Sequence, residues 1–287
     1  MVKQQILESM RRLSADIRIE TVKMIGEAGF GHIGGSASIA DVLAVLYGEV
    51  MQINPGNPNW ENRDWFVLSK GHCAPALYAA LALKGYFPLD ELKTLNKCGT
   101  KLPSHADRRV PGIDMSTGSL GQGISAAVGI ALANRLQGRD NYTYCIVGDG
   151  EINEGQVWEA CQQASHQDLD HFFCFVDWNK KQLDGSLECI NAPLDIEEKF
   201  RAFGFNTVTV KGYDTEAIYN AIQSGKKVHG KPHCIILDTI KGLGVDIAEE
   251  QEFNHYLSYG PEQAQKTVEE IERRYAEGTY PGGDFKW

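Results

Sequence analysis

The sequence has no Cys-x-x-Cys pair, no apolar signal core and no excess of basic residues. Its seven cysteines, at positions 73, 98, 145, 161, 174, 189 and 234, are scattered, which is typical of reduced, structural thiols. No continuous run approaches about 18 apolar residues, the length that a membrane span requires. The formal net charge of −10 disfavours nucleic acid and anionic membranes as partners, because both attract a basic face. We therefore expect a cytoplasmic protein that binds neither.

Internal repeats, low-complexity tracts and linkers are also absent, so residues 1–287 are predicted to form a single domain. Short apolar or β-branched runs, typical of buried strands, alternate with segments of helical periodicity, such as 5–25 and 38–48. This alternation predicts an α/β fold in which a parallel sheet is sandwiched by helices. The predicted strands of this sheet are 65–68, 142–147, 172–176, 206–210 and 233–238.

Oxygen-bearing side chains follow two of these strands. Gly148-Asp149-Gly150 ends the strand 142–147, and Asp177-Trp178-Asn179 follows the strand 172–176. Since ligands bind outside the carboxyl ends of parallel strands, Asp149 and Asn179 are expected to face one site. A carboxylate and an amide oxygen are hard ligands that suit Mg²⁺, and Mg²⁺ completes its shell with substrate phosphates. The two glycines leave room for a diphosphate close to the backbone.

The Gly-Asp-Gly turn, with Asn179 thirty positions after Asp149, resembles the thiamine diphosphate motif of transketolases. Two further blocks resemble that family closely, namely 68–78, which contains Ser69-Lys70-Gly71-His72, and 110–123, which contains Ser116-Thr117-Gly118-Ser119-Leu120-Gly121. Other segments match in part. These are Gly31-His32-Ile33-Gly34, where isoleucine replaces proline, 102–107, which matches at the histidine and the acid, and 241–245, which precedes His255.

The resemblance covers essentially the whole chain and implies a thiamine diphosphate-binding fold that requires thiamine diphosphate and Mg²⁺. It assigns the metal to Asp149, Asn179 and a backbone carbonyl near Lys181. It assigns the cofactor to His72, Gly118, Leu120, Gly150, Glu154 and Asn179. It assigns the substrate's hydroxyl groups and proton transfers to His32, His72, His105 and His255. Histidine suits that role because an imidazole of ordinary pKa donates or accepts a proton near neutral pH.

A full transketolase is roughly twice as long as this chain and continues into a pyrimidine-binding domain, which supplies the glutamate that activates the cofactor. No residue here matches that glutamate. The resemblance therefore implies the N-terminal subunit of a split transketolase, active with a C-terminal subunit in a two-plus-two heterotetramer. Such an enzyme transfers a two-carbon ketol unit from a ketose to an aldose, with the cofactor as electron sink.

Three alternatives remain open at this point. The α subunit of a thiamine-dependent 2-oxo acid dehydrogenase is also a split chain, although its motifs outside Gly-Asp-Gly differ. A regulatory Mg²⁺-nucleotide module is disfavoured by the lack of a Gly-x-x-x-x-Gly-Lys-Ser/Thr loop. An α/β domain of another role would require every matching block to be a coincidence.

The substrate is expected to differ from the usual sugar phosphates. Transketolases commonly carry an arginine nine positions before the third histidine, and Asn96 occupies that position here. A neutral amide does not reproduce the forked phosphate contact of an arginine. The hypothesis is a branched, sulfonated or non-phosphorylated sugar, and the alternative is a clamp relocated to nearby cations. Those cations are Lys97, Lys101, Arg108 and Arg109.

Overall fold

The computed structural model describes residues 2–281, and its centre is a five-stranded sheet of order β2-β3-β4-β8-β7. All four neighbouring pairs in this sheet run parallel. The predicted α/β fold with a parallel sheet is thereby confirmed. The strands of the sheet are β2 (Trp65–Leu68), β3 (Thr143–Gly148), β4 (Phe172–Trp178), β7 (Asn206–Lys211) and β8 (His233–Asp238).

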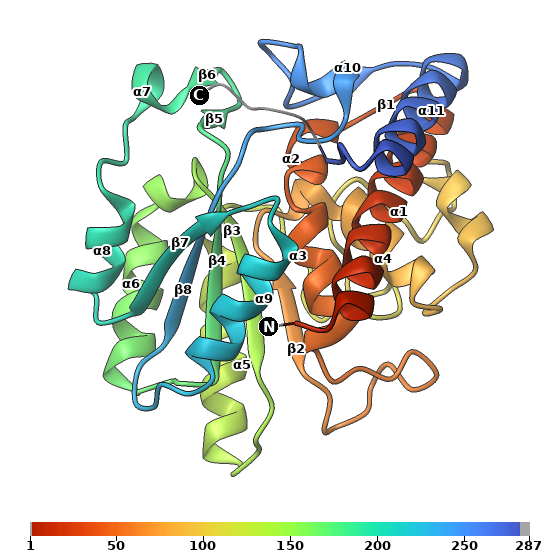
Figure 1. Ribbon diagram of the computed structural model, residues 1–287. Coiled ribbons are helices and arrows are strands. Elements are labelled where there is room, and N and C mark those ends of the chain that lie inside the picture. The colour runs from red at the N-terminus through yellow and green to blue at the C-terminus, as the bar shows by residue number, and fades with distance from the viewer. Residues whose placement is uncertain (1, 282–287) are drawn as a thin grey trace.

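Helices cover both faces of the sheet. Figure 1 shows α6 and α8 on one side, and α1, α4 and α9 on the other. Two separate apolar clusters fill the two interfaces, so β2, β3, β4 and β8 are mostly buried and mostly apolar. The edge strand β7 is the exception, since its residues are polar or valine and are partly or fully exposed. The helices are α1 (Gln4–Ala28), α2 (Ile33–Ala37), α3 (Ala40–Val45), α4 (Ala74–Leu83), α5 (Gln122–Leu136), α6 (Gly155–His166), α7 (Leu187–Ile190), α8 (Ile196–Ala202), α9 (Thr215–Gly225), α10 (Asp246–Glu249) and α11 (Pro261–Glu277).

The helix predicted over 38–48 differs from the structure. The helical path starts earlier, at Ile33, is interrupted at Ser38 and Ile39, and ends in a π-helical turn over Leu46–Val50. The interruption has a tertiary cause, because the Ser38 hydroxyl donates to the buried carboxylate of Asp177 at 2.7 Å. Helical periodicity carries no information about a partner so distant in sequence.

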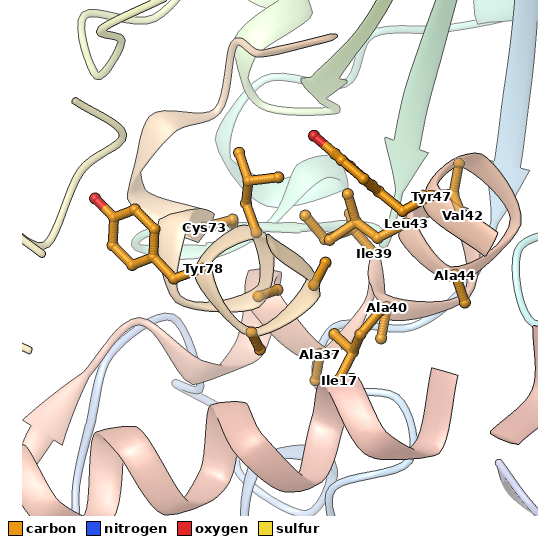
Figure 2. Packing of buried hydrophobic residues seen from close by; sticks show 14 of the residues in the cluster. Ile17, Ala37, Ile39, Ala40, Val42, Leu43, Ala44, Tyr47, Cys73 and Tyr78 are labelled. Carbon is orange, nitrogen blue, oxygen red and sulfur yellow. The ribbon is translucent and has the colours of Figure 1, made fainter. Parts of the chain in front are cut away.

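The segment Ile33–Val50 is long and apolar enough to cross a membrane by composition, with a mean hydropathy of 1.3. The absence of an uninterrupted apolar run in the sequence did not predict this segment. In the fold, 89% of it is buried. Figure 2 shows Ala37, Ala40 and Leu43 of this segment gathered with Ile17 of α1 in the core. Its apolar composition is therefore explained by packing between helices.

Strand β4 also differs from its predicted bounds. Asp177 and Trp178 belong to the strand and pair with Leu237 and Asp238 of β8, so only Asn179 lies beyond its end. A carboxylate inside a buried strand is tolerated here because Lys70 forms an ion pair with it. The sequence pattern of β4 does not reveal that partner.

Two small antiparallel pairings complete the fold. β1 (Phe30–Gly31) pairs with β9 (Leu257–Ser258), which brings the chain before His32 beside the chain after His255. β5 (Lys181–Gln182) pairs with β6 (Gly185–Ser186) just beyond the end of β4. Both pairings lie next to the carboxyl end of the parallel sheet, which is where a ligand site is expected.

Candidate active site

A cavity of about 400 Å³ lies at the carboxyl ends of β3 and β4. Every residue that the sequence assigned to the cofactor, the metal or catalysis lines it. The structure thus brings together segments from the whole length of the chain. These residues are His32, His72, His105, Gly118, Leu120, Asp149, Gly150, Glu154, Asn179, Lys181 and His255.

The four histidines form one cluster on a wall of this cavity. The ring of His32 is central, with its centroid 5.5 Å from His72, 5.6 Å from His105 and 5.3 Å from His255. The rings of His72 and His255 lie 4.7 Å apart. His255, whose alignment with the family motif was the least defined, therefore belongs to the same group as the other three.

Burial shifts these imidazoles away from their ordinary titration range. It lowers the pKa of His32 to about 4, with help from His105, and the pKa of His255 to about 3, with help from Lys241. Burial and Lys70 hold the pKa of His72 well below its usual value, and burial also lowers the pKa of His105. At neutral pH all four rings are uncharged, so they accept and donate hydrogen bonds as neutral imidazoles.

The predicted metal ligands lie together at the ends of β3 and β4. Asp149 is 2% exposed, and its two oxygens accept the N–H groups of Gly150 and Lys180 at 2.8 and 2.6 Å. The Asn179 amide nitrogen donates to Asp177 at 2.8 Å, while its oxygen accepts the Lys181 N–H at 3.2 Å. Burial and the neighbouring Asp177 raise the pKa of Asp149 to about 7. A carboxylate held in this way is stabilised by a cation.

Two buried lysines that the sequence did not single out face the same cavity. Lys70 is 2% exposed, pairs with Asp177, and donates to the Gly35 carbonyl at 3.2 Å. Lys241 donates to the Lys181 carbonyl at 3.2 Å and contacts His255 Nδ1 at 3.1 Å. Burial, followed by repulsion from Lys70, lowers the pKa of Lys241 to about 8. Both lysines lay inside matched blocks, but neither was assigned a role.

Glu151 is a further residue that sequence reasoning missed, although it directly follows Gly148-Asp149-Gly150. Its carboxylate is buried and accepts the Ser69 hydroxyl at 2.5 Å, the Gly121 N–H at 2.8 Å and the Gly148 N–H at 3.0 Å. These donors lie after β2, at the start of α5 and at the end of β3. One side chain therefore fixes three walls of the cavity relative to one another.

Glycines give the cavity its shape where backbone and ligand must approach closely. Gly118 has a φ of 148°, and a Cβ there would lie 2.9 Å from the His105 ring. A Cβ at Gly150 would lie 3.0 Å from the Gln182 side chain. Larger residues at either position would displace a cavity wall. The space, the lysines and the oxygen ligands together suit a diphosphate with a divalent cation.

Asn96 does not line the cavity. Its backbone is left-handed, with a φ of 58°, and its side-chain oxygen accepts the Ser104 hydroxyl at 2.8 Å. Arg108 and Arg109 line a different depression, beside Arg63. Among the described residues, the cations that line the site cavity are lysines, and none is an arginine.

A family model described as "Transketolase, thiamine diphosphate binding domain" matches residues 9–277. The chain belongs to the transketolase family. It is 51% identical over 261 residues to the 6-deoxy-6-sulfo-D-fructose transketolase subunit SqwG of Clostridium sp. (strain MSTE9), covering 91% of this chain and 95% of that protein. It is 35% identical to an apulose-4-phosphate transketolase subunit of Phocaeicola vulgatus, covering 93% of this chain and 95% of that protein.

Solved transketolases share the fold. The structure of the transketolase from Leishmania mexicana matches with a TM-score of 0.86 at 31% identity. The match covers 97% of this chain and 43% of that one, so this chain spans less than half of the solved enzyme. Its length instead corresponds to relatives that are named as transketolase subunits.

Proposed function

We propose that this chain is the N-terminal subunit of a two-polypeptide transketolase that uses thiamine diphosphate and Mg²⁺. The observation that carries the proposal is the single cavity that collects all eleven predicted site residues in a transketolase-family fold. Its correspondence in length to two named transketolase subunits supports the split arrangement. A C-terminal subunit would supply the pyrimidine-binding half of the site, in a heterotetramer of two subunits of each kind.

The residues present fit both groups. Asp149, Asn179 and the Lys181 carbonyl would hold Mg²⁺, and the raised pKa of Asp149 supports a cation there. Gly118, Leu120, Gly150 and Glu154 would line the cofactor. Thiamine diphosphate, when bound, supplies an electron sink for cleavage of a carbon–carbon bond.

The chain's own contribution to ketol transfer is positioning and proton handling. The four neutral imidazoles of the histidine cluster would bind the hydroxyl groups of the sugar. Each of them can accept a proton from a hydroxyl group at one ring nitrogen while its other N–H donates a hydrogen bond. Lys70 and Lys241 would offset the negative charge of the diphosphate. Burial of these groups strengthens each interaction, because water screens it less.

We further propose that the sugar is sulfonated. A sulfonate carries one negative charge, whereas a sugar phosphate carries about 1.5 to 2 at neutral pH, so it requires less cationic compensation. The absence of an arginine among the described residues lining the cavity, and the 51% identity to a sulfofructose transketolase subunit, support this choice. Because the chain is also 35% identical to an apulose-4-phosphate transketolase subunit, a phosphorylated sugar is tested beside the sulfonated one.

The test is reconstitution. The chain is purified alone and together with a C-terminal transketolase subunit encoded beside it, and ketol transfer is measured with thiamine diphosphate and Mg²⁺. We expect turnover by the complex and little or none by the chain alone. Robust turnover by the chain alone would refute the split arrangement.

The substrate arm compares 6-deoxy-6-sulfofructose with xylulose 5-phosphate as ketol donors for the same complex. We expect a higher kcat/KM for the sulfonated sugar. The matched controls are Arg108→Ala and Arg109→Ala, which are expected to leave both values unchanged because these residues line another depression. A strong preference for xylulose 5-phosphate would refute the sulfonated substrate while leaving the ketol transfer intact.

A further inference from the structure

A buried polar network links α1 to α3, and its residues do not line the site cavity. Arg18 of α1 is 1% exposed and forms an ion pair with Asp41 of α3 at 2.6 Å. Ser14 completes the network, since its hydroxyl donates to Asp41 and accepts from Arg18, both at 2.6 Å. A fully buried guanidinium is costly unless its donors are satisfied, so the remaining partners of Arg18 are informative.

One of those partners is the loop that carries Lys241. The Arg18 Nε–H donates to the Leu243 carbonyl at 2.6 Å. Gly244, the next residue, has a φ of 78°, and a Cβ there would lie 2.8 Å from the same Arg18 nitrogen. The backbone of this loop at Leu243 and Gly244 therefore contacts the guanidinium group of Arg18 directly. Arg18 itself does not line the site cavity.

The same loop leads to His255. Asn254 donates to the Lys241 carbonyl at 2.8 Å and to the Ala248 carbonyl at 2.7 Å, which ties the two ends of the segment 241–255 together. Gly242 N–H donates to the carbonyl of Gly34 at 2.9 Å, in helix α2, which directly follows His32. Leu243 is thus connected to Lys241 and His255 by a short path of backbone and hydrogen bonds.

The second partner of Arg18 comes from the segment after α11. The hydroxyl of Tyr280 accepts a hydrogen bond from Arg18, and it lies 3.0 Å from the Ser14 hydroxyl. The guanidinium carbon also lies 5.4 Å from the centre of the Tyr280 ring. α11 also contacts the loop, because Arg274 forms an ion pair with Asp246 at 3.0 Å. Tyr280 therefore reaches the loop through Arg18, whereas Arg274 contacts the loop directly.

We propose that Arg18, held in place by Tyr280, positions the loop 241–255 and with it Lys241 and His255. Arg18 and Tyr280 are positioning residues, because neither lines the cavity. Tyr280, which follows α11, is then part of the architecture that supports the active site. The role in cofactor binding rests on the proposed function, whereas the effect on the loop does not.

The test variant is Tyr280→Phe, which removes one hydroxyl group and keeps the ring above Arg18. The matched control is Tyr275→Phe, which removes the hydroxyl bond from α11 to Glu8 on the surface and keeps the ring that packs 6.0 Å from the Tyr280 ring. Hydrogen–deuterium exchange of the full chain is followed at the amides of 241–255. We expect exchange about tenfold faster in Tyr280→Phe and unchanged in Tyr275→Phe. Equal exchange in the two variants would overturn the proposal.

Calorimetry of thiamine diphosphate with Mg²⁺ on the complex of this chain with its C-terminal subunit gives a second readout. We expect affinity to fall about tenfold in Tyr280→Phe. In a Lys241→Met background the same substitution is expected to cost much less, because the group that the loop positions is gone. Full additivity of the two substitutions would show that Tyr280 stabilises the fold without positioning Lys241. Faster exchange in Tyr280→Phe, together with a wild-type complex that does not bind the cofactor, would refute the proposed function alone.

Discussion

Replacing Glu151 tests whether one buried carboxylate organises the cavity. In Glu151→Ala, the Ser69 hydroxyl and the N–H groups of Gly121 and Gly148 lose their acceptor in a buried setting. An unsatisfied buried donor costs about 1–3 kcal/mol. Because the site cavity can admit water to some of them, we take the lower part of the range and expect a loss of about 3–5 kcal/mol in the free energy of unfolding.

Glu151→Gln separates the three bonds. The amide oxygen can still accept from Ser69 and Gly121, as Oε1 does now, but the amide nitrogen then faces the Gly148 N–H. One lost acceptor predicts a smaller loss, about 1–2 kcal/mol.

The assay is urea unfolding followed by circular dichroism, with Glu154→Gln as control, because Glu154 lines the same cavity and accepts none of these bonds. A loss below about 1 kcal/mol in Glu151→Ala, or equal losses in Ala and Gln, would refute the reasoning.

Three further predictions concern the charges of the site. Lys70→Met leaves its carboxylate partner buried and unpaired, so we expect a loss of about 3–5 kcal/mol in unfolding experiments. The partly exposed pair made by Lys180 serves as control, and Lys180→Met should cost less than about 1 kcal/mol. Burial lowers the pKa of His255 to about 3, so the unfolded chain binds more protons than the folded chain below pH 6.5. The contribution of His255 to the free energy of unfolding should therefore be complete above pH 6.5 and should decline towards pH 4, as measured by thermal unfolding. An increase in stability on acidification would contradict this. Asn179→Ala should abolish Mg²⁺-dependent retention of thiamine diphosphate and leave the circular dichroism spectrum unchanged; unchanged retention would place the metal elsewhere.

Most of the fold follows from local sequence patterns. The alternation of apolar runs with helical segments predicted the parallel sheet because each pattern depends on residues close together in the chain. The placement of Asp149 and Asn179 also followed, since the ends of parallel strands meet at one edge of the sheet. The glycines of the cavity were found through motifs whose close backbone approach tolerates no side chain.

What only the tertiary structure decided concerns partners that are far apart in the chain. Spacing does not reveal that Lys70 neutralises Asp177, or that β1–β9 pairing sets His255 beside His32. The helix break at Ser38 depends on the same distant carboxylate.

Burial decided the chemistry of the site in the same way. The sequence predicted histidines of ordinary pKa, whereas desolvation in the folded chain keeps their rings neutral over a wider range of pH. Local sequence sets the backbone conformation of each segment. The ion pairs and the titration of the site depend on which segments exclude water from one another, and packing alone determines that.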